Sequence, residues 1–258
     1  MKQKKINRFG HSNSSFWIGG KHTVEAALGN SKRKIIKLVL NLKHKNSQLL
    51  YNTNIKIEYE NDRFFSKIFN NEIPHQGYAA LIEKIEENNI KFYLQSNKIF
   101  NIIALDGVTD PRNIGSIVRS AVAFGFDALL INKKDFNSKS YLLYKAASGA
   151  MENIITLEVA NIQNEIKLLK SYSFAIIAMD GNSNDSIYNY IPDLKKLIIF
   201  GSESMGIKKT IRSTCDNIFQ IPINKKIESL NVSNAVAATL SVLDYKKKRP
   251  LLNKEWAF

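Results

Sequence analysis

Short apolar runs alternate with helical patterns throughout the second part of the chain. Most of these runs end in Gly, Asp or Asn, and apolar residues recur at helical spacing between them. Continuous apolar strands separated by helices are typical of a mostly parallel sheet that is covered on both faces. We therefore predict an α/β domain with strands at residues 102–105, 128–131, 174–179, 197–200 and 218–221.

The first part of the chain shows shorter and more varied patterns. A helical segment places Val24, Ala27 and Leu28 on one face, and it is followed by β-like runs at 34–40, 55–59 and 78–82, with a second helical stretch at 43–52 and a further segment at 63–69. These patterns predict a small α/β domain over residues 16–85. Residues 1–15 are basic and lack apolar periodicity, which is typical of a mobile arm or of an ordinary frayed terminus. We expect a linker at 86–101, the second domain at 102–249 and a tail at 250–258.

The net charge changes the picture of what this chain binds. Lys and Arg number 37 against 23 Asp and Glu, which gives a net charge of +14. Residues 1–45 hold eleven of these basic residues and a single acidic one, Glu25. Such an excess indicates an acidic polymer, such as a nucleic acid, as partner. The alternative is that the basic composition only keeps the protein in solution.

Other classes of protein are disfavoured by composition. Four His and one Cys, Cys215, are too few for a zinc ribbon or a disulfide framework, so we expect no metal. No apolar run approaches the ~20 residues of a membrane span, and the first residues lack the apolar stretch of a secretory signal. We therefore expect a cytoplasmic protein without a membrane partner.

Three turns after predicted strands carry unusual polar residues, and ligands of open α/β sheets collect at the carboxyl ends of strands. The first turn contains Asn113, which occupies an N-cap position before a predicted helix at 114–125. Arg119 lies off the apolar stripe of that helix, above small residues, with Arg112 two turns closer to the helix start. This pattern favours an anion site, although a plain cap with a surface arginine would look the same.

The second and third turns also concentrate polar groups. Gly201-Ser-Glu-Ser-Met-Gly206 is a glycine-bounded loop with one acid, Glu203, and it matches neither a dinucleotide fingerprint nor a P-loop. The third turn runs from Ile221 to Ser233 and includes Ser229 and Asn231 before the last predicted helix. Its Ser and Asn side chains exceed what helix capping requires.

Taken together, these segments resemble the SpoU/TrmH family of RNA 2′-O-ribose methyltransferases. The resemblance rests on DPRNIGSIVRSA with Asn113 and Arg119, on GSESMG with Gly201 and Glu203, and on SLNVSNA with Ser229, Leu230 and Asn231. In addition, FWIGGKHTVEAAL and HQGYAAL are similar to the small RNA-binding domain of the RlmB-type branch, which acts on 23S ribosomal RNA. Gly20-Lys21 and Ser204-Met205 depart from residues that relatives often carry.

The resemblance implies a fold, a cofactor and an assembly. It implies a knotted parallel-sheet domain of the SPOUT trefoil type, preceded by a small α/β RNA-binding domain. It implies S-adenosylmethionine held in the knot by backbone groups around Gly201, Ile221 and Leu230, and a homodimer. The RNA contacts that we expect are Arg112, Lys32, Arg33 and Lys34.

The same resemblance assigns the catalytic residues. The resemblance implies that Arg119 takes or relays the proton of the hydroxyl, although an arginine pKa above about 12 makes a neutral guanidine rare. We expect Arg119 to hold a phosphate and stabilise the developing alkoxide, while Asn113, Ser229 and Asn231 orient it. Glu203 is expected to fix Arg119 or the ribose, or to cap a following turn. The expected reaction is methylation of a ribose, in guanosine of 23S ribosomal RNA; the alternatives are a transfer RNA substrate and an RNA-binding protein without catalysis.

Overall fold

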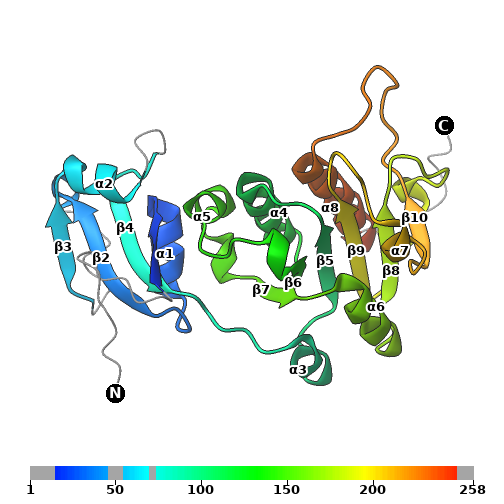
Figure 1. Ribbon diagram of the computed structural model, residues 1–258, viewed down its shortest axis with the longest axis horizontal. Helices are drawn as coiled ribbons and strands as arrows, with labels where there is room; N and C mark the ends of the chain where they lie inside the picture. Colours follow the sequence, from blue (N-terminus) through cyan, green and yellow to red (C-terminus); the bar gives the residue numbers. More distant parts are fainter. Residues whose placement is uncertain (1–14, 46–54, 70–73, 249–258) are drawn as a thin grey trace.

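The computed structural model describes residues 15–45, 55–69 and 74–248. They form two α/β units that lie side by side along the long axis of the molecule (Figure 1). The expected arm before Ser15, the expected tail after residue 248 and much of the expected helix at 43–52 lie outside the described residues. Where the helix at 43–52 was expected to start, the structure has a short 3₁₀ turn, η1 (Leu42–His44).

The N-terminal unit is built on a mixed sheet of four strands in the order β1-β4-β2-β3. β4 pairs antiparallel with both β1 and β2, whereas β2 and β3 are parallel. The expected strands at 34–40, 55–59 and 78–82 correspond to β2, β3 and β4, and β1 was not expected. The elements are β1 (Ser15–Gly19), α1 (Lys21–Gly29), β2 (Ile35–Asn41), β3 (Ile57–Glu60), α2 (Asp62–Ile68) and β4 (Tyr78–Glu83).

The second unit is a wholly parallel sheet of six strands in the order β10-β8-β9-β5-β6-β7, as predicted in type. The edge strand β7, in which apolar and polar residues alternate, was not expected from the pattern. Its elements are β5 (Asn101–Asp106), α4 (Pro111–Ala123), β6 (Ala128–Asn132), α5 (Tyr141–Ala147), β7 (Ile155–Val159), α6 (Ile162–Ser171), β8 (Ala175–Met179), β9 (Lys196–Gly201), α7 (Lys209–Arg212), β10 (Asn217–Phe219) and α8 (Val232–Lys248), with 3₁₀ turns η3 (Lys133–Asp135), η4 (Ala150–Glu152) and η5 (Ile187–Asn189).

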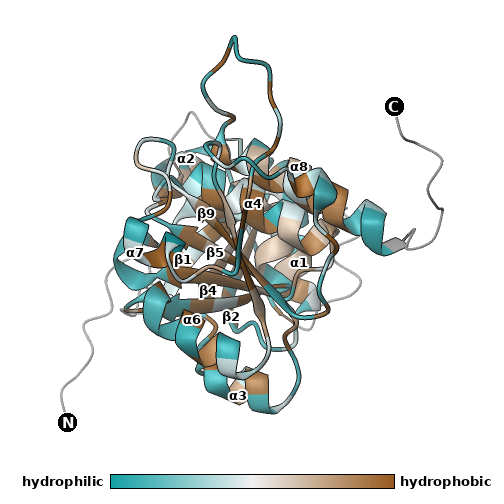
Figure 2. Cartoon of the chain, turned by 90° about the vertical axis from the view of Figure 1, so that its right-hand side faces the viewer, coloured by the Kyte–Doolittle hydropathy of each residue, from teal (hydrophilic) through white to brown (hydrophobic). Residues whose placement is uncertain are grey.

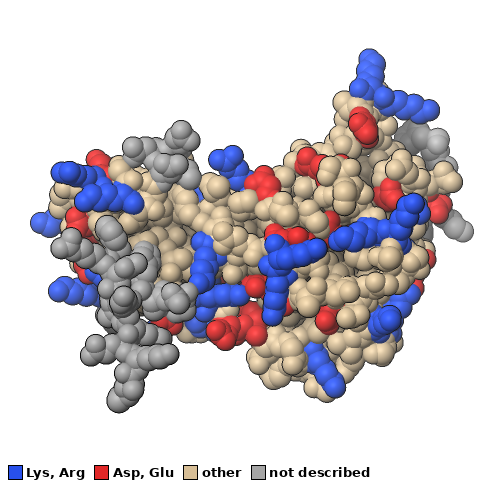
Figure 3. Space-filling model, viewed as in Figure 1, with Lys and Arg blue, Asp and Glu red and all other residues tan. Residues whose placement is uncertain are grey.

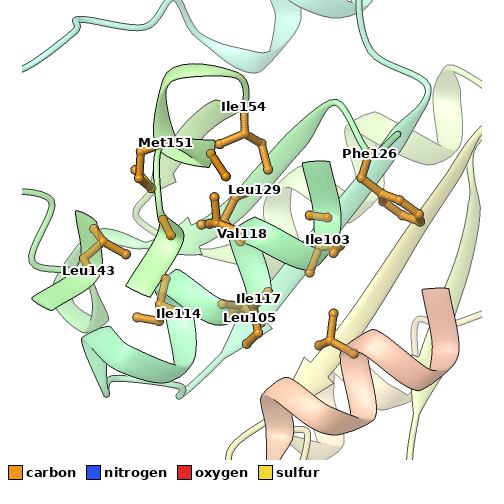
Figure 4. Packing of buried hydrophobic residues seen from close by; sticks show 14 of the residues in the cluster. Ile103, Leu105, Ile114, Ile117, Val118, Phe126, Leu129, Leu143, Met151 and Ile154 are labelled. Atoms are coloured by element: carbon orange, nitrogen blue, oxygen red, sulfur yellow. The ribbon is translucent and has the colours of Figure 1, made fainter. Parts of the chain in front are cut away.

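Both faces of this sheet are covered, because successive side chains of a strand point to opposite faces. On one face, Leu105 of β5 packs with Ile114 and Ile117 of α4 and with residues of α5 and α8 (Figure 4). On the other face, Ile102 packs against α3 (Ile90–Gln95), α6 and α7. Figure 2 shows the result, with apolar strands at the centre and polar residues on the outer sides of the helices.

Two boundaries differ from the sequence prediction. The segment expected to be a plain linker contains α3, whose Ile90, Tyr93 and Leu94 are buried against the sheet. Helix α4 begins at Pro111 with Asp110 as its N-cap, so Asn113 is an early helical residue and the N-cap prediction for it is wrong. The physical reason is that Pro is favoured at the first helical position and Asp at the preceding one.

Candidate active site

The carboxyl ends of the central strands meet at one edge of the parallel sheet. Asp106 at the end of β5 pairs with Gly201 at the end of β9, and Phe200 pairs with Met179 of β8. Phe219 of β10 pairs with the same Met179. The turns that follow β5, β9 and β10 therefore leave the sheet side by side, which is where ligands of this architecture collect.

Three side chains from these turns form one hydrogen-bonded cluster. The Asn231 amide Nδ2 donates to Asn113 Oδ1 at 3.1 Å and to Glu203 Oε1 at 2.7 Å. Glu203 Oε1 also accepts from the backbone N–H of Val232 at 3.2 Å, the first residue of α8. Asn231 Oδ1 accepts in turn from the backbone N–H of Ser233 at 3.0 Å. All three sequence motifs thus contribute one residue to this polar cluster.

The other two predicted catalytic residues lie outside the cluster's hydrogen bonds. Arg119 and Ser229 are exposed, and neither side chain forms a hydrogen bond or ion pair with a residue that the structure describes. Glu203 bonds to Asn231 and to the start of α8, so the expectation that it fixes Arg119 is not met in this arrangement. The guanidinium of Arg119 is consequently available to a ligand. Arg112, two turns earlier on α4, is also exposed.

The loop after β9 depends on a glycine at its first position. A Cβ added to Gly201 would lie 2.1 Å from the carbonyl carbon of Gly206 and 2.4 Å from the backbone nitrogen of Ile207. No side chain fits there, because the loop closes on itself with Gly206 N–H donating to Ser202 O at 2.9 Å. Any larger residue at 201 would therefore open the loop that carries Glu203.

The buried carboxylate of Asp106 was not singled out in the sequence. It is 1% exposed and accepts hydrogen bonds from the backbone N–H of Lys208 at 2.9 Å and from the Lys208 ammonium. It thereby ties the segment after Gly206 to the end of β5. The only available signal was an Asp at the end of an apolar strand, since its partner is 102 residues away in the sequence.

Comparison with known proteins decides the family. A family model described as the SpoU rRNA methylase family matches residues 101–241. The chain belongs to the SpoU rRNA methylase family. A second model, described as RNA 2′-O ribose methyltransferase substrate binding, matches residues 17–88. A Staphylococcus epidermidis protein assigned to the TrmH family of tRNA/rRNA methyltransferases is 34% identical over 186 residues, which cover 70% of this chain and 74% of that protein. This chain is therefore an RNA methyltransferase of the SpoU/TrmH family.

Solved structures share the fold of this SpoU-family chain. The SpoU methyltransferase AviRb from Streptomyces viridochromogenes, solved in complex with its cofactor AdoMet, has a TM-score of 0.79 at 18% identity, and 94% of each chain is covered. The A. aeolicus TrmH/SpoU tRNA modifying enzyme has a TM-score of 0.54 at 19% identity and covers 62% of this chain and 85% of its own. The first match extends over both units, whereas the second extends over fewer residues of this chain.

One of the predicted cofactor residues of this SpoU-family chain, Leu230, provides a backbone donor that suits S-adenosylmethionine. Gly201, Ile221 and Leu230 are partly buried; Gly201 ends β9, and the other two lie on the loop after β10. Residues 221–231 form an extended loop that rises beyond the helices (Figure 1). Among the described residues, the backbone N–H groups of Ser229 and Leu230 have no internal hydrogen-bond partner. Free backbone donors beside partly buried apolar side chains match a ligand with a polar amino-acid end and a flat adenine.

One predicted RNA contact is wrong. The Arg33 side chain is 2% exposed and lies between the two units, where its NH2 group is 2.9 Å from Glu152 Oε1 and its Nε donates to both Glu152 oxygens. Its NH1 group donates to the Glu83 carbonyl at 2.7 Å. All three guanidinium nitrogens are bonded to protein acceptors and the side chain is buried, so it is not available to a phosphate. Lys32 and Lys34 are exposed, and Lys34 pairs with Glu83 at 3.0 Å.

A crevice lies away from the cluster. It has a volume of about 630 Å³ and opens between β7 and the segment from Lys84 to Ile90.

Within residues 15–45, 55–69 and 74–248, no group of His, Cys, Asp and Glu is arranged to hold a metal ion. No helix in this part of the chain is long and apolar enough to cross a bilayer.

Proposed function

We propose that this SpoU-family chain transfers a methyl group from S-adenosylmethionine to the 2′-hydroxyl of a ribose in large-subunit ribosomal RNA, on a guanosine. The observation that carries the proposal is the cluster of Asn113, Glu203 and Asn231 at the carboxyl edge of the sheet, with the unpaired Arg119 on the same helix as Asn113. The cluster holds three loops together while it leaves a cation open to solvent.

The chemistry explains why such a site suits a ribose hydroxyl. When bound, S-adenosylmethionine supplies an activated methyl group with a good leaving group. The remaining requirements are to position the hydroxyl and to stabilise the negative charge that develops on its oxygen. Arg119 provides a permanent positive charge that can hold the adjacent phosphate and stabilise the alkoxide. Asn113, Ser229 and Asn231 orient the nucleotide, while Glu203 fixes the Asn231 amide.

The N-terminal unit supports ribosomal RNA over transfer RNA as substrate. Its family model is described as substrate binding for RNA 2′-O ribose methyltransferases. The A. aeolicus enzyme, described as modifying tRNA, covers only 62% of this chain. A methyltransferase that positions a large folded RNA gains from a second RNA-binding unit, because contacts with the sugar–phosphate backbone fix register on the substrate.

The trefoil knot and the homodimer remain predictions from the family resemblance. The same holds for the cofactor residues Gly201, Ile221 and Leu230, whose backbone groups would hold S-adenosylmethionine. Size measurement in solution checks the dimer, and the cofactor contacts are checked by a structure with S-adenosylmethionine bound.

One experiment separates the candidate substrates. Purified protein is offered 23S ribosomal RNA and transfer RNA with isotopically labelled S-adenosylmethionine, followed by nuclease digestion and mass spectrometry of the nucleosides. Labelled 2′-O-methylguanosine from ribosomal RNA alone supports the proposal. Label in transfer RNA, or on a base, would overturn it. Calorimetry that detects no cofactor binding would favour an RNA-binding protein without catalysis.

A further inference from the structure

A group of basic side chains lies where the N-terminal unit meets helix α5. Lys145 of α5 reaches across to β1, because a Cβ placed on Gly20 would lie 3.0 Å from the Lys145 ammonium and 3.5 Å from Gln76 Oε1. Gln76 Oε1 also accepts from the backbone N–H of Lys21 at 3.0 Å. Three segments, from both units, therefore converge at this point.

Lys43 belongs to the same group. Burial lowers the pKa of His75; nearby Lys43 and Lys145 lower it further, while Asp62 raises it. Both lysines therefore lie near enough to the His75 ring to act on its charge. The neighbouring His44 bonds through Nε2 to the Gln76 carbonyl at 2.8 Å, which holds this turn in place.

Among the described residues, this group holds three lysines, Lys21, Lys43 and Lys145, and the carboxylates of Glu25 and Asp62. The side chain of Lys145 forms no ion pair or hydrogen bond with any described residue, although burial lowers its pKa. Asp62 is engaged by the Asn41 amide at 2.6 Å, and Glu25 is 3.9 Å from the Lys21 ammonium, at the limit of an ion pair. A partly desolvated ammonium without a counter-ion gains more from an added anion than a fully solvated one.

The position of Lys145 relates this group to the candidate active site. Helices α4 and α5 cross in close contact at Gly115, where a Cβ would lie 2.5 Å from the carbonyl of Leu143. Gly115 is two residues from Asn113, and Lys145 is two residues from Leu143. The lysine group and the catalytic cluster are thus carried by two helices that are in direct contact. Figure 1 shows α5 between the N-terminal unit and α4.

Resting on the function proposed above, we propose that Lys145, with Lys21 and Lys43, forms an interdomain contact for the sugar–phosphate backbone of the RNA, which fixes the strand between the N-terminal unit and the catalytic cluster. In Figure 3, basic side chains lie over both units and also between them, with acidic side chains among them on the face shown. The buried Arg33–Glu152 pair keeps the two halves of this contact at a constant separation.

The test compares two lysine variants with equal change in charge. Lys145→Gln removes the proposed contact, and Lys167→Gln removes an exposed lysine on α6, which covers the opposite face of the sheet. Binding of a labelled 23S ribosomal RNA fragment is measured against salt concentration. We expect Lys145→Gln to weaken binding and to lower the slope of log affinity against log salt by about 0.7 to 0.9, the value for one phosphate contact. Lys167→Gln should match the wild type, and Lys145→Arg should restore the slope.

Two further measurements separate the loss of an RNA contact from other effects of the substitution. Thermal unfolding and S-adenosylmethionine binding of Lys145→Gln should match the wild type, which separates a lost RNA contact from a folding defect. Equal salt slopes for Lys145→Gln and Lys167→Gln would overturn the inference, even if the wild type methylates ribose. If the slope changes but the wild type methylates no ribose, the contact stands and the proposed function fails.

Discussion

Two groups of side chains connect distant parts of the sequence in opposite environments. One is the buried pair of Arg33 and Glu152, and the other is the exposed cluster around Asn231. Each connects residues almost 120 positions apart, at separations of 119 and 118. At the domain interface both side chains are 2% exposed, and bidentate bonds saturate the carboxylate. At the sheet edge the polar groups face solvent, and the side chain of Arg119, on the same helix as Asn113, lacks a partner among the described residues. Saturated polar groups fix geometry, whereas unsatisfied ones remain available to a substrate.

The largest effect is expected when the exposed site loses its cation. Arg119→Ala should lower kcat by roughly 10²- to 10³-fold or more, because it removes a charged donor from the oxygen on which charge develops. Affinity for S-adenosylmethionine, measured by calorimetry, should stay at the wild-type value. Arg112→Ala is the matched control on the same helix and should weaken RNA binding with little change in kcat. Near-normal turnover by Arg119→Ala would refute the assignment.

The next effect concerns the buried pair. Arg33→Met should lower the free energy of unfolding by about 3–5 kcal/mol, because it leaves the Glu152 carboxylate buried without its main partner. Lys34→Met, which breaks the exposed pair with Glu83, should cost no more than about 1 kcal/mol. Urea unfolding measures both values. A double variant, Arg33→Met with Glu152→Leu, should recover much of the loss. If Arg33→Met unfolds like Lys34→Met, the pair does not stabilise the interface.

A smaller effect should follow from changing the bridging amide. Asn231→Ser keeps a side-chain acceptor for the Ser233 N–H but loses the donor to Asn113 and Glu203. We expect activity to fall about tenfold, from the loss of the hydrogen bonds to the Asn113 amide and the Glu203 carboxylate, with unfolding changed by less than about 1 kcal/mol. Asn231→Ala removes the cap as well and should unfold more easily. Equal activity of Asn231→Ser and wild type would show that the bridge is dispensable.

The smallest effect is expected for the exposed N-terminal lysines. Replacing Lys32 and Lys34 by Gln should lower the salt slope of RNA affinity by at most about 0.7 to 0.9 per residue. The modified nucleotide should remain the same, because phosphate contacts position the RNA without specifying its sequence. Nucleoside mass spectrometry and filter binding check both expectations. A shift in the methylated position would contradict them.

The sequence allowed the exposed site to be predicted better than the buried interface. Asn113, Glu203 and Asn231 each follow a predicted strand, and parallel strands bring their carboxyl ends to one edge, so their meeting follows from sheet type. Arg33 sits in a basic run, and its partner Glu152 belongs to the other unit, so local charge suggested a solvated cation. The buried role of Asp106 was not predicted for the same reason, since Lys208 approaches it only in the folded chain.

The place of β9 in the sheet determines the order in which the chain can fold. β9 lies between β5 and β8. One edge of β5 therefore stays unpaired until residues 95 positions later have been synthesised. At ribosomal speeds that delay lasts roughly 5 to 20 s. β8 has no neighbours except β9 and β10, and both follow it in the chain. Fragments that end before Lys196 therefore retain an unpaired parallel edge and are expected to aggregate.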